Sequence, residues 1–106
     1  MSKEIAKILV DIGSVNFDFK KYFTLTSGLK SPVYVDCRKI ISFTKERDYI
    51  VDKAIHYLQE NSIDSDIIAG GETAGIPYAA FLAQKLNKPM VYIRKKSKGF
   101  GINKQI

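Results

Sequence analysis

Residues 66–77 read Asp-Ile-Ile-Ala-Gly-Gly-Glu-Thr-Ala-Gly-Ile-Pro, and this stretch decides the fold. Its β-branched start predicts a strand over residues 66–70. Pro77 suits the first turn of a helix over residues 75–86, because its missing N–H costs nothing at that position. The glycines in between let backbone amides approach a ligand, and the helix N-terminus carries partial positive charge. The stretch therefore predicts a strand-to-helix turn that suits an anion.

A cationic segment follows the next apolar run. Residues 89–93 predict a second strand, and four basic residues come soon after it: Arg94, Lys95, Lys96 and Lys98. A helical crossover makes the two strands parallel, and ligands of such sheets bind beyond the carboxyl ends of the strands. We therefore expect the glycine turn and the basic segment at the same edge. By itself the turn is a weak signal, since it matches neither a dinucleotide fingerprint nor a Walker loop and is equally consistent with a plain tight turn.

The excess positive charge lies in the last residues. The chain has 106 residues, 17 of them basic and 11 acidic, for a formal net charge of +6. Residues 94–106 hold five basic and no acidic residues, which leaves 12 basic against 11 acidic residues in the rest. Such a local tail attracts phosphate-rich ligands, although a solvated cationic segment without a ligand is equally common. Nucleic-acid binding through this tail is a weaker alternative, because the remainder is near neutral.

Cysteine and histidine offer no catalytic pattern. Cys37 is the only cysteine, so an internal disulfide and a zinc spacing are excluded, and we expect a partly buried thiol in a strand. The only histidine, His56, is expected on the surface of a helix. No apolar run approaches the roughly 20 residues of a membrane helix, and the charged N-terminus does not resemble a signal peptide. We therefore expect a cytoplasmic protein.

The remaining segments predict a small α/β domain. Apolar residues at helical spacing predict an amphipathic helix over residues 3–12, ended by a glycine. Strand-like residues 16–26 and 33–38 flank a Gly/Pro turn and predict a hairpin. Thr44 can cap a helix over residues 45–60. We expect one domain over 1–106: residues 1–40 form a helix and a hood hairpin, and residues 41–106 form a partial α/β core that ends in the basic loop.

Four blocks of the sequence resemble orotate phosphoribosyltransferase, a type I phosphoribosyltransferase. They are Phe-Thr-Leu-Thr-Ser-Gly at 23–28, Ser-Pro-Val-Tyr-Val-Asp-Cys-Arg at 31–38, Gly-Gly-Glu-Thr-Ala-Gly-Ile-Pro at 70–77 and Arg-Lys-Lys-Ser-Lys-Gly at 94–99. In order and at family spacing, they look like the N-terminal half of that enzyme. The family transfers ribose 5-phosphate from phosphoribosyl pyrophosphate to orotate, with magnesium, in pyrimidine nucleotide synthesis. The resemblance implies a truncated type I phosphoribosyltransferase-like parallel sheet with an N-terminal helix and a hairpin hood.

The resemblance also implies roles for individual residues. Tyr34 would pack against the orotate ring, and Arg94, Lys95 and Lys98 would contact pyrophosphate, with Lys98 as the catalytic residue on a mobile loop. Four residues would meet pyrophosphate through backbone amides: Glu72, Thr73, Ala74 and Gly75. In the family, the mobile loop that carries Lys98 reaches the partner subunit's site, which implies a homodimer. Magnesium is implied as the cofactor, with no metal ligand assigned in this chain.

The sequence departs from the family pattern in several places. Many members carry lysine where Thr26 and Ala74 stand, and Lys30 is the candidate to replace the first of these charges. A histidine common in the family's mobile loop is Phe100 here. The family's acidic strand and Thr/Gly-rich phosphate loop do not occur in residues 1–106. We therefore expect a chain that is inactive alone or is completed by a separately encoded C-terminal half. The alternative is a non-catalytic truncated homologue or a dimerising anion-binding module.

Overall fold

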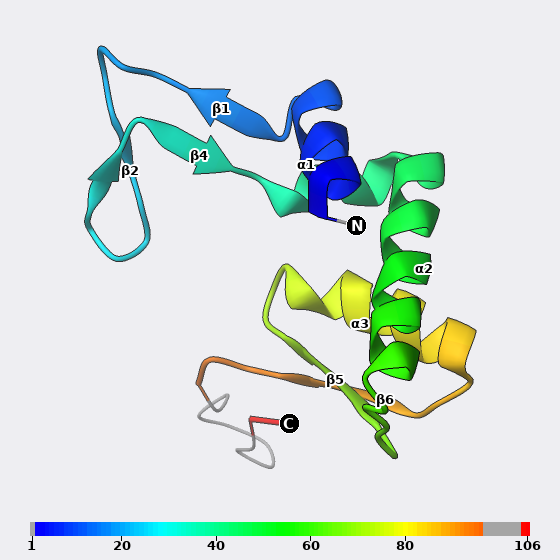
Figure 1. The fold of residues 1–106 in the computed structure, drawn as a ribbon. Coiled ribbons are helices and arrows are strands. Elements are labelled where there is room, and N and C mark those ends of the chain that lie inside the picture. Colours follow the sequence, from blue (N-terminus) through cyan, green and yellow to red (C-terminus); the bar gives the residue numbers. More distant parts are fainter. Residues whose placement is uncertain (1, 97–104) are drawn as a thin grey trace. The chain divides into compact units, whose positions relative to one another are not determined.

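The structure, a computed structural model, describes residues 2–96 and 105–106 (Figure 1). The chain divides into two compact units, Met1–Asp48 and Tyr49–Ile106. Helix α2, Thr44–Glu60, runs across the boundary between them. We describe each unit by itself.

The first unit begins with the predicted amphipathic helix. Helix α1 spans Ser2–Asp11, which confirms the expectation for residues 3–12. Gly13 ends it with a φ of 78°, a value that glycine adopts without steric cost. The N–H of Ser14 then donates to the Leu9 carbonyl at 2.9 Å, so one of the last helical carbonyls is satisfied.

The hood consists of two short antiparallel ladders rather than one hairpin. Strands β1, Val15–Phe17, and β4, Val33–Val35, pair with Asn16 opposite Tyr34. Strands β2, Phe23–Thr24, and β3, Lys30–Ser31, form the outer ladder. The Ser31 hydroxyl interrupts the second arm, because it bonds both the Val33 carbonyl at 2.8 Å and the Val33 N–H at 3.1 Å. The predicted hairpin is thus present, with its pairing divided between these two ladders.

The residues after β4 form a turn of helix where we expected a strand. The 3₁₀ helix η1 spans Cys37–Ser42, and the Asp36 carboxylate caps it by accepting the Arg38 N–H at 3.1 Å. Cys37 is therefore exposed at the start of this helix. The prediction of a partly buried strand cysteine was wrong, because the cap diverts the backbone from the extended conformation.

The second unit contains the strand, helix, strand unit that the sequence predicts. Strand β5, Ile68–Gly71, leads into helix α3, Gly75–Leu86, which matches the predicted helix bounds. Strand β6, Met90–Ile93, pairs with β5 in parallel, with Gly71 opposite Ile93. Within the part of the chain that the structure describes, β5 and β6 form a two-stranded sheet. The α/β fold class is confirmed.

Charged side chains form pairs on the surface of this second unit. Asn87 ends α3 in the left-handed conformation, with a φ of 54°. The Lys88 ammonium then reaches back to the Asp64 carboxylate and the Ser65 carbonyl. His56 is exposed on α2 and lies 2.8 Å from the Glu60 carboxylate, as expected of a surface helix histidine.

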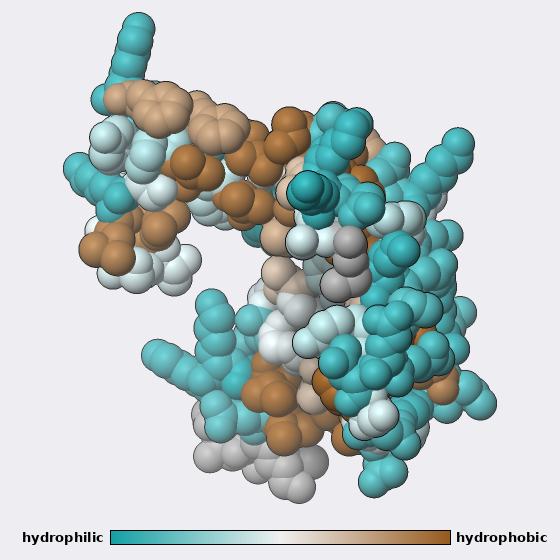
Figure 2. Space-filling view, in the orientation of Figure 1, coloured by the Kyte–Doolittle hydropathy of each residue, from teal (hydrophilic) through white to brown (hydrophobic). Residues whose placement is uncertain are grey.

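Few side chains are fully buried among the described residues. The buried apolar side chains are those of Ile40, Val51, Ala79 and Ala83. Many large apolar side chains are exposed instead, and Figure 2 shows hydrophobic residues gathered over the hood strands. Phe17 and Phe19 stack there with ring centroids 6.2 Å apart and remain 60% and 71% exposed. A chain with so little buried apolar surface has a small hydrophobic contribution to its stability.

Candidate functional site

The turn between β5 and α3 is built around a close backbone approach. A Cβ atom on Gly70 would lie 2.6 Å from the Gly75 carbonyl oxygen, a distance that no real side chain tolerates. Gly70 is buried, whereas Thr73 and Ala74 beyond it are exposed. The glycines thus bring the strand end against the start of the helix and present the intervening residues outward.

The first turn of α3 has no capping side chain. Ala74 occupies the cap position with helical backbone angles and makes no side-chain hydrogen bond to the helix. The N–H of Ile76 donates to the Thr73 carbonyl at 3.2 Å, and the Glu72–Thr73 peptide is cis. Backbone donors at an uncapped helix start are available to an anion, and the helix dipole favours one.

Glu72 ties this turn to the basic segment after β6. Its N–H donates to the Ile93 carbonyl at 2.9 Å, and its carboxylate accepts the Lys95 N–H at 2.8 Å. The structure therefore brings the Glu72–Gly75 turn and the start of the basic segment together at the end of the sheet, as the strand order predicted. Lys95 is exposed to solvent.

Arg94 packs against Tyr92 of the preceding strand, β6. Its guanidinium carbon lies 5.5 Å from the centre of the Tyr92 ring, and its Nη2 donates to the Tyr92 hydroxyl at 3.2 Å. Since both contacts are with an exposed side chain, they are weak enough to be exchanged for a contact with an anion. Lys98 lies outside the described residues.

Gln105 is a residue of this edge that sequence reasoning missed. Its side-chain amide donates to the Arg94 carbonyl at 3.2 Å and to the Lys95 carbonyl at 3.0 Å. The backbone carbonyl of Gln105 accepts the Arg94 N–H at 2.7 Å. These contacts join chain positions separated by ten or eleven residues. No local sequence pattern predicts such a long-range pairing.

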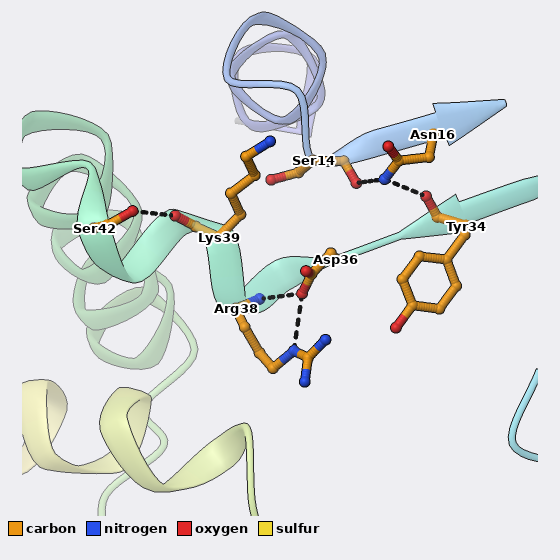
Figure 3. Close-up of polar contacts among 7 residues, drawn as sticks. All are labelled: Ser14, Asn16, Tyr34, Asp36, Arg38, Lys39 and Ser42. Carbon is orange, nitrogen blue, oxygen red and sulfur yellow. Dashed lines mark hydrogen bonds and ion pairs between the residues drawn. The ribbon is translucent and has the colours of Figure 1, made fainter.

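The hood carries the other candidates. The Tyr34 ring packs against Phe23 at 5.9 Å between centroids and is 37% exposed. Lys30 is exposed on β3, opposite Thr24. Asp36 and Arg38 follow Tyr34 closely in the chain. Arg38 Nε donates a hydrogen bond of 3.0 Å to Asp36 Oδ1 (Figure 3). Sequence reasoning assigned no role to Asp36 or Arg38, although the Asp-Cys-Arg spacing was visible.

The described residues contain no large cluster of metal-ligating side chains. Residues 2–96 and 105–106 contain no group of three or more His, Cys, Asp or Glu side chains that could hold a metal. None of the described helices is long and apolar enough to cross a membrane.

Comparison with solved structures identifies the class of protein. The crystal structure of orotate phosphoribosyltransferase from Aeropyrum pernix superposes with a TM-score of 0.74 at 32% identity, over 85% of this chain and 52% of that chain. The structure of Leishmania donovani UMP synthase superposes equally well at 33% identity, over 90% of this chain and 20% of that one. The fold is therefore that of a phosphoribosyltransferase.

Sequence comparison finds similarity to one group of these enzymes. No protein-family model matches the chain. An orotate phosphoribosyltransferase from Rhizobium rhizogenes is 48% identical over 108 aligned residues, which cover 100% of this chain and 47% of that protein. The chain is thus a homologue of the orotate phosphoribosyltransferases, and it spans about half the length of the curated relatives it matches. The predicted resemblance is confirmed.

Proposed function

We propose that this chain carries the pyrophosphate-binding turn and the orotate-binding hood of an orotate phosphoribosyltransferase. The single observation that carries the proposal is the Glu72 contact, which joins an uncapped helix start to a basic segment. Backbone donors and cations thereby converge on one exposed edge of the second unit. Such a convergence of fixed dipoles and positive charge favours an anion with several phosphate oxygens.

The chemistry of the reaction explains what these groups would do. Displacing pyrophosphate from the anomeric carbon of the ribose leaves negative charge on the departing oxygens. Arg94, Lys95 and Lys98 would stabilise that charge, and the amides of Glu72–Gly75 would hold the same phosphates through neutral donors. Groups that act on charge developing in the transition state lower the barrier rather than only tightening binding. In this proposal Lys98 is the catalytic residue.

The hood would hold the acceptor base. Tyr34 presents a partly exposed ring already supported by Phe23, which suits a flat pyrimidine. Lys30 supplies a nearby positive charge for the orotate anion and would replace the lysine absent at Thr26. These assignments are independent of those at the pyrophosphate turn, since the two groups lie in different units.

The proposal extends to partners and setting. Orotate and phosphoribosyl pyrophosphate are the proposed substrates, a homodimer the proposed assembly, and the cytoplasm the proposed location. The acidic strand and phosphate loop, which are absent from residues 1–106, would come from a separate C-terminal half. Magnesium is the proposed cofactor, as the family resemblance implies, and no residue of this chain is assigned to it as a ligand.

Calorimetric titration of the 106-residue chain with pyrophosphate and with orotate tests the proposal. Saturable binding of both ligands at separate sites is the expected result. Binding of pyrophosphate without orotate would favour the anion-binding module instead. Binding of neither ligand by the folded chain would refute the proposed function.

A further inference from the structure

The Asp36 carboxylate, just after β4, orients the Arg38 side chain. Asp36 Oδ1 accepts both the backbone N–H of Arg38 at 3.1 Å and its Nε at 3.0 Å (Figure 3). The carboxylate is also the cap of η1, so it is anchored to the backbone that carries the arginine. Only the Nε edge of the guanidinium is engaged by Asp36, and the terminal nitrogens carry the remaining donors.

The backbone around this pair is held firmly. The N–H of Asp36 donates at 2.8 Å to the carbonyl of Ser14, a residue that is fully buried. The Asn16 amide joins the same carbonyl to that of Tyr34, at 3.3 and 3.4 Å. These bonds cross from the segment after α1 to β4, so they fix the position of Asp36 relative to the Tyr34 strand.

Tyr34 lies on the open side of the guanidinium. Figure 3 shows the Arg38 terminal nitrogens and the Tyr34 hydroxyl pointing toward one another. Contact with Asp36 above all, and then with Tyr34, raises the pKa of the Arg38 guanidinium, which therefore stays charged. The Arg38 side chain is 61% exposed, and an ion pair so open to water contributes little to stability.

We propose that Arg38, oriented by Asp36, recognises the carboxylate of a flat, ring-bearing acid that packs against Tyr34. The geometry suits this ligand because a guanidinium fork pairs with a carboxylate through two parallel hydrogen bonds, while an aromatic ring accepts a flat ring. The inference rests on the proposed function and deepens it, since orotate is a flat pyrimidine with one carboxylate. Arg38 is then a specificity-determining residue and Asp36 a positioning residue.

Comparison of orotate with uracil isolates this contact, because uracil is the same ring without the carboxylate. Calorimetry on the 106-residue chain should show that orotate binds better than uracil. Arg38→Ala should weaken orotate binding about tenfold while leaving uracil binding unchanged. Arg38→Lys keeps the charge without the fork and should lose part of that preference. Asp36→Ala should reduce the preference as well, because no side-chain oxygen then accepts the Arg38 Nε–H and orients the fork.

The outcomes separate this inference from the proposed function. Lys20→Ala removes an exposed positive charge from the same unit and should leave the preference for orotate intact. Circular dichroism of each variant shows that it is folded. If folded Arg38→Ala and Arg38→Lys both keep the full preference, the inference is overturned while the proposed function stands. If the unmodified chain binds orotate no better than uracil, both are overturned.

Discussion

Gly70 and Gly75 are in direct backbone contact across the turn from β5 to α3. A Cβ atom on Gly70 would lie 2.6 Å from the Gly75 carbonyl oxygen and 2.7 Å from the Ala79 Cβ. Neither neighbour is the end of a flexible side chain, so the helix itself would have to move. The proposed pyrophosphate turn, Glu72–Gly75, therefore depends on the absence of a side chain at Gly70.

Gly70→Ala should therefore destabilise the fold. We expect a loss of about 1–3 kcal/mol in the free energy of unfolding, as for other overpacked positions. Gly71→Ala is the matched control, because a Cβ there meets nothing within 4 Å. It should change the free energy of unfolding by no more than about 0.5 kcal/mol. Urea denaturation of both variants measures the difference, and equal losses would contradict the close-approach explanation.

The Asp64–Lys88 ion pair should make stability depend on pH. The hydrogen bond from Lys88, followed by that from the Ser65 N–H, holds the pKa of Asp64 below its ordinary value. A carboxylate with a depressed pKa in the folded state stabilises the fold above its ordinary pKa. That contribution is lost as pH falls through the depressed value.

Asp64→Asn should accordingly lower the melting temperature at pH 7 and have a shrinking effect below about pH 4. Because the pair is at the surface, the effect at pH 7 should be small. Thermal melts of both proteins across this range measure it. In a Lys88→Gln background the same substitution should have a smaller pH-dependent effect, because only the hydrogen bond from the Ser65 N–H then lowers the pKa of Asp64. An undiminished effect would show that Lys88 is not the main cause of the lowered pKa.

Some of the fold could be predicted from the sequence because its signals are local. Helix α3 begins and ends where expected, since Pro77 suits its first turn and a turn-forming Asn87 follows its last residue. The parallel pairing of β5 and β6 follows from their short helical connection. Both sequence signals lie within the segment whose structure they predict.

Other features depend on side-chain contacts that no residue pattern shows. The Asp36 cap turns the chain into η1 and exposes Cys37, although residues 33–38 are strand formers. Gln105 reaches the Arg94 carbonyl from eleven residues away. The proposed role of the Asp36–Arg38 pair could not be predicted from the sequence. It depends on the contact between Tyr34 and the Arg38 guanidinium, which only the structure shows.

Pyrophosphate binding should depend on salt. The proposed attraction to Arg94, Lys95 and Lys98 is between charges, and the Debye length falls from about 10 Å at 0.1 M to about 3 Å at 1 M salt. The dissociation constant should therefore rise roughly threefold or more over this range. Lys98→Ala should weaken binding at low salt, whereas Lys45→Ala, an exposed lysine at the start of α2, should not. Affinity that is insensitive to both salt and Lys98→Ala would remove the basic segment from the site.

The last prediction concerns catalysis by the 106-residue chain. Purified alone, it should form no orotidine monophosphate from orotate and phosphoribosyl pyrophosphate above background. The sequence contains neither adjacent acidic residues to hold the ribose hydroxyls nor a Thr/Gly-rich loop to hold the 5-phosphate. The anomeric carbon is then not positioned against orotate, and positioning is worth roughly 7–11 kcal/mol of the barrier in favourable cases.

A separate polypeptide that contains the acidic strand and the phosphate loop should restore turnover when it is mixed with this chain. Its strands would extend the two-stranded β5–β6 sheet and bring the missing phosphate contacts to the same edge. Product formation followed by absorbance measures the effect, and Lys98→Ala in the mixture should abolish it. Robust turnover by the 106-residue chain alone, lost on Lys98→Ala, would show that these residues already suffice to position the ribose.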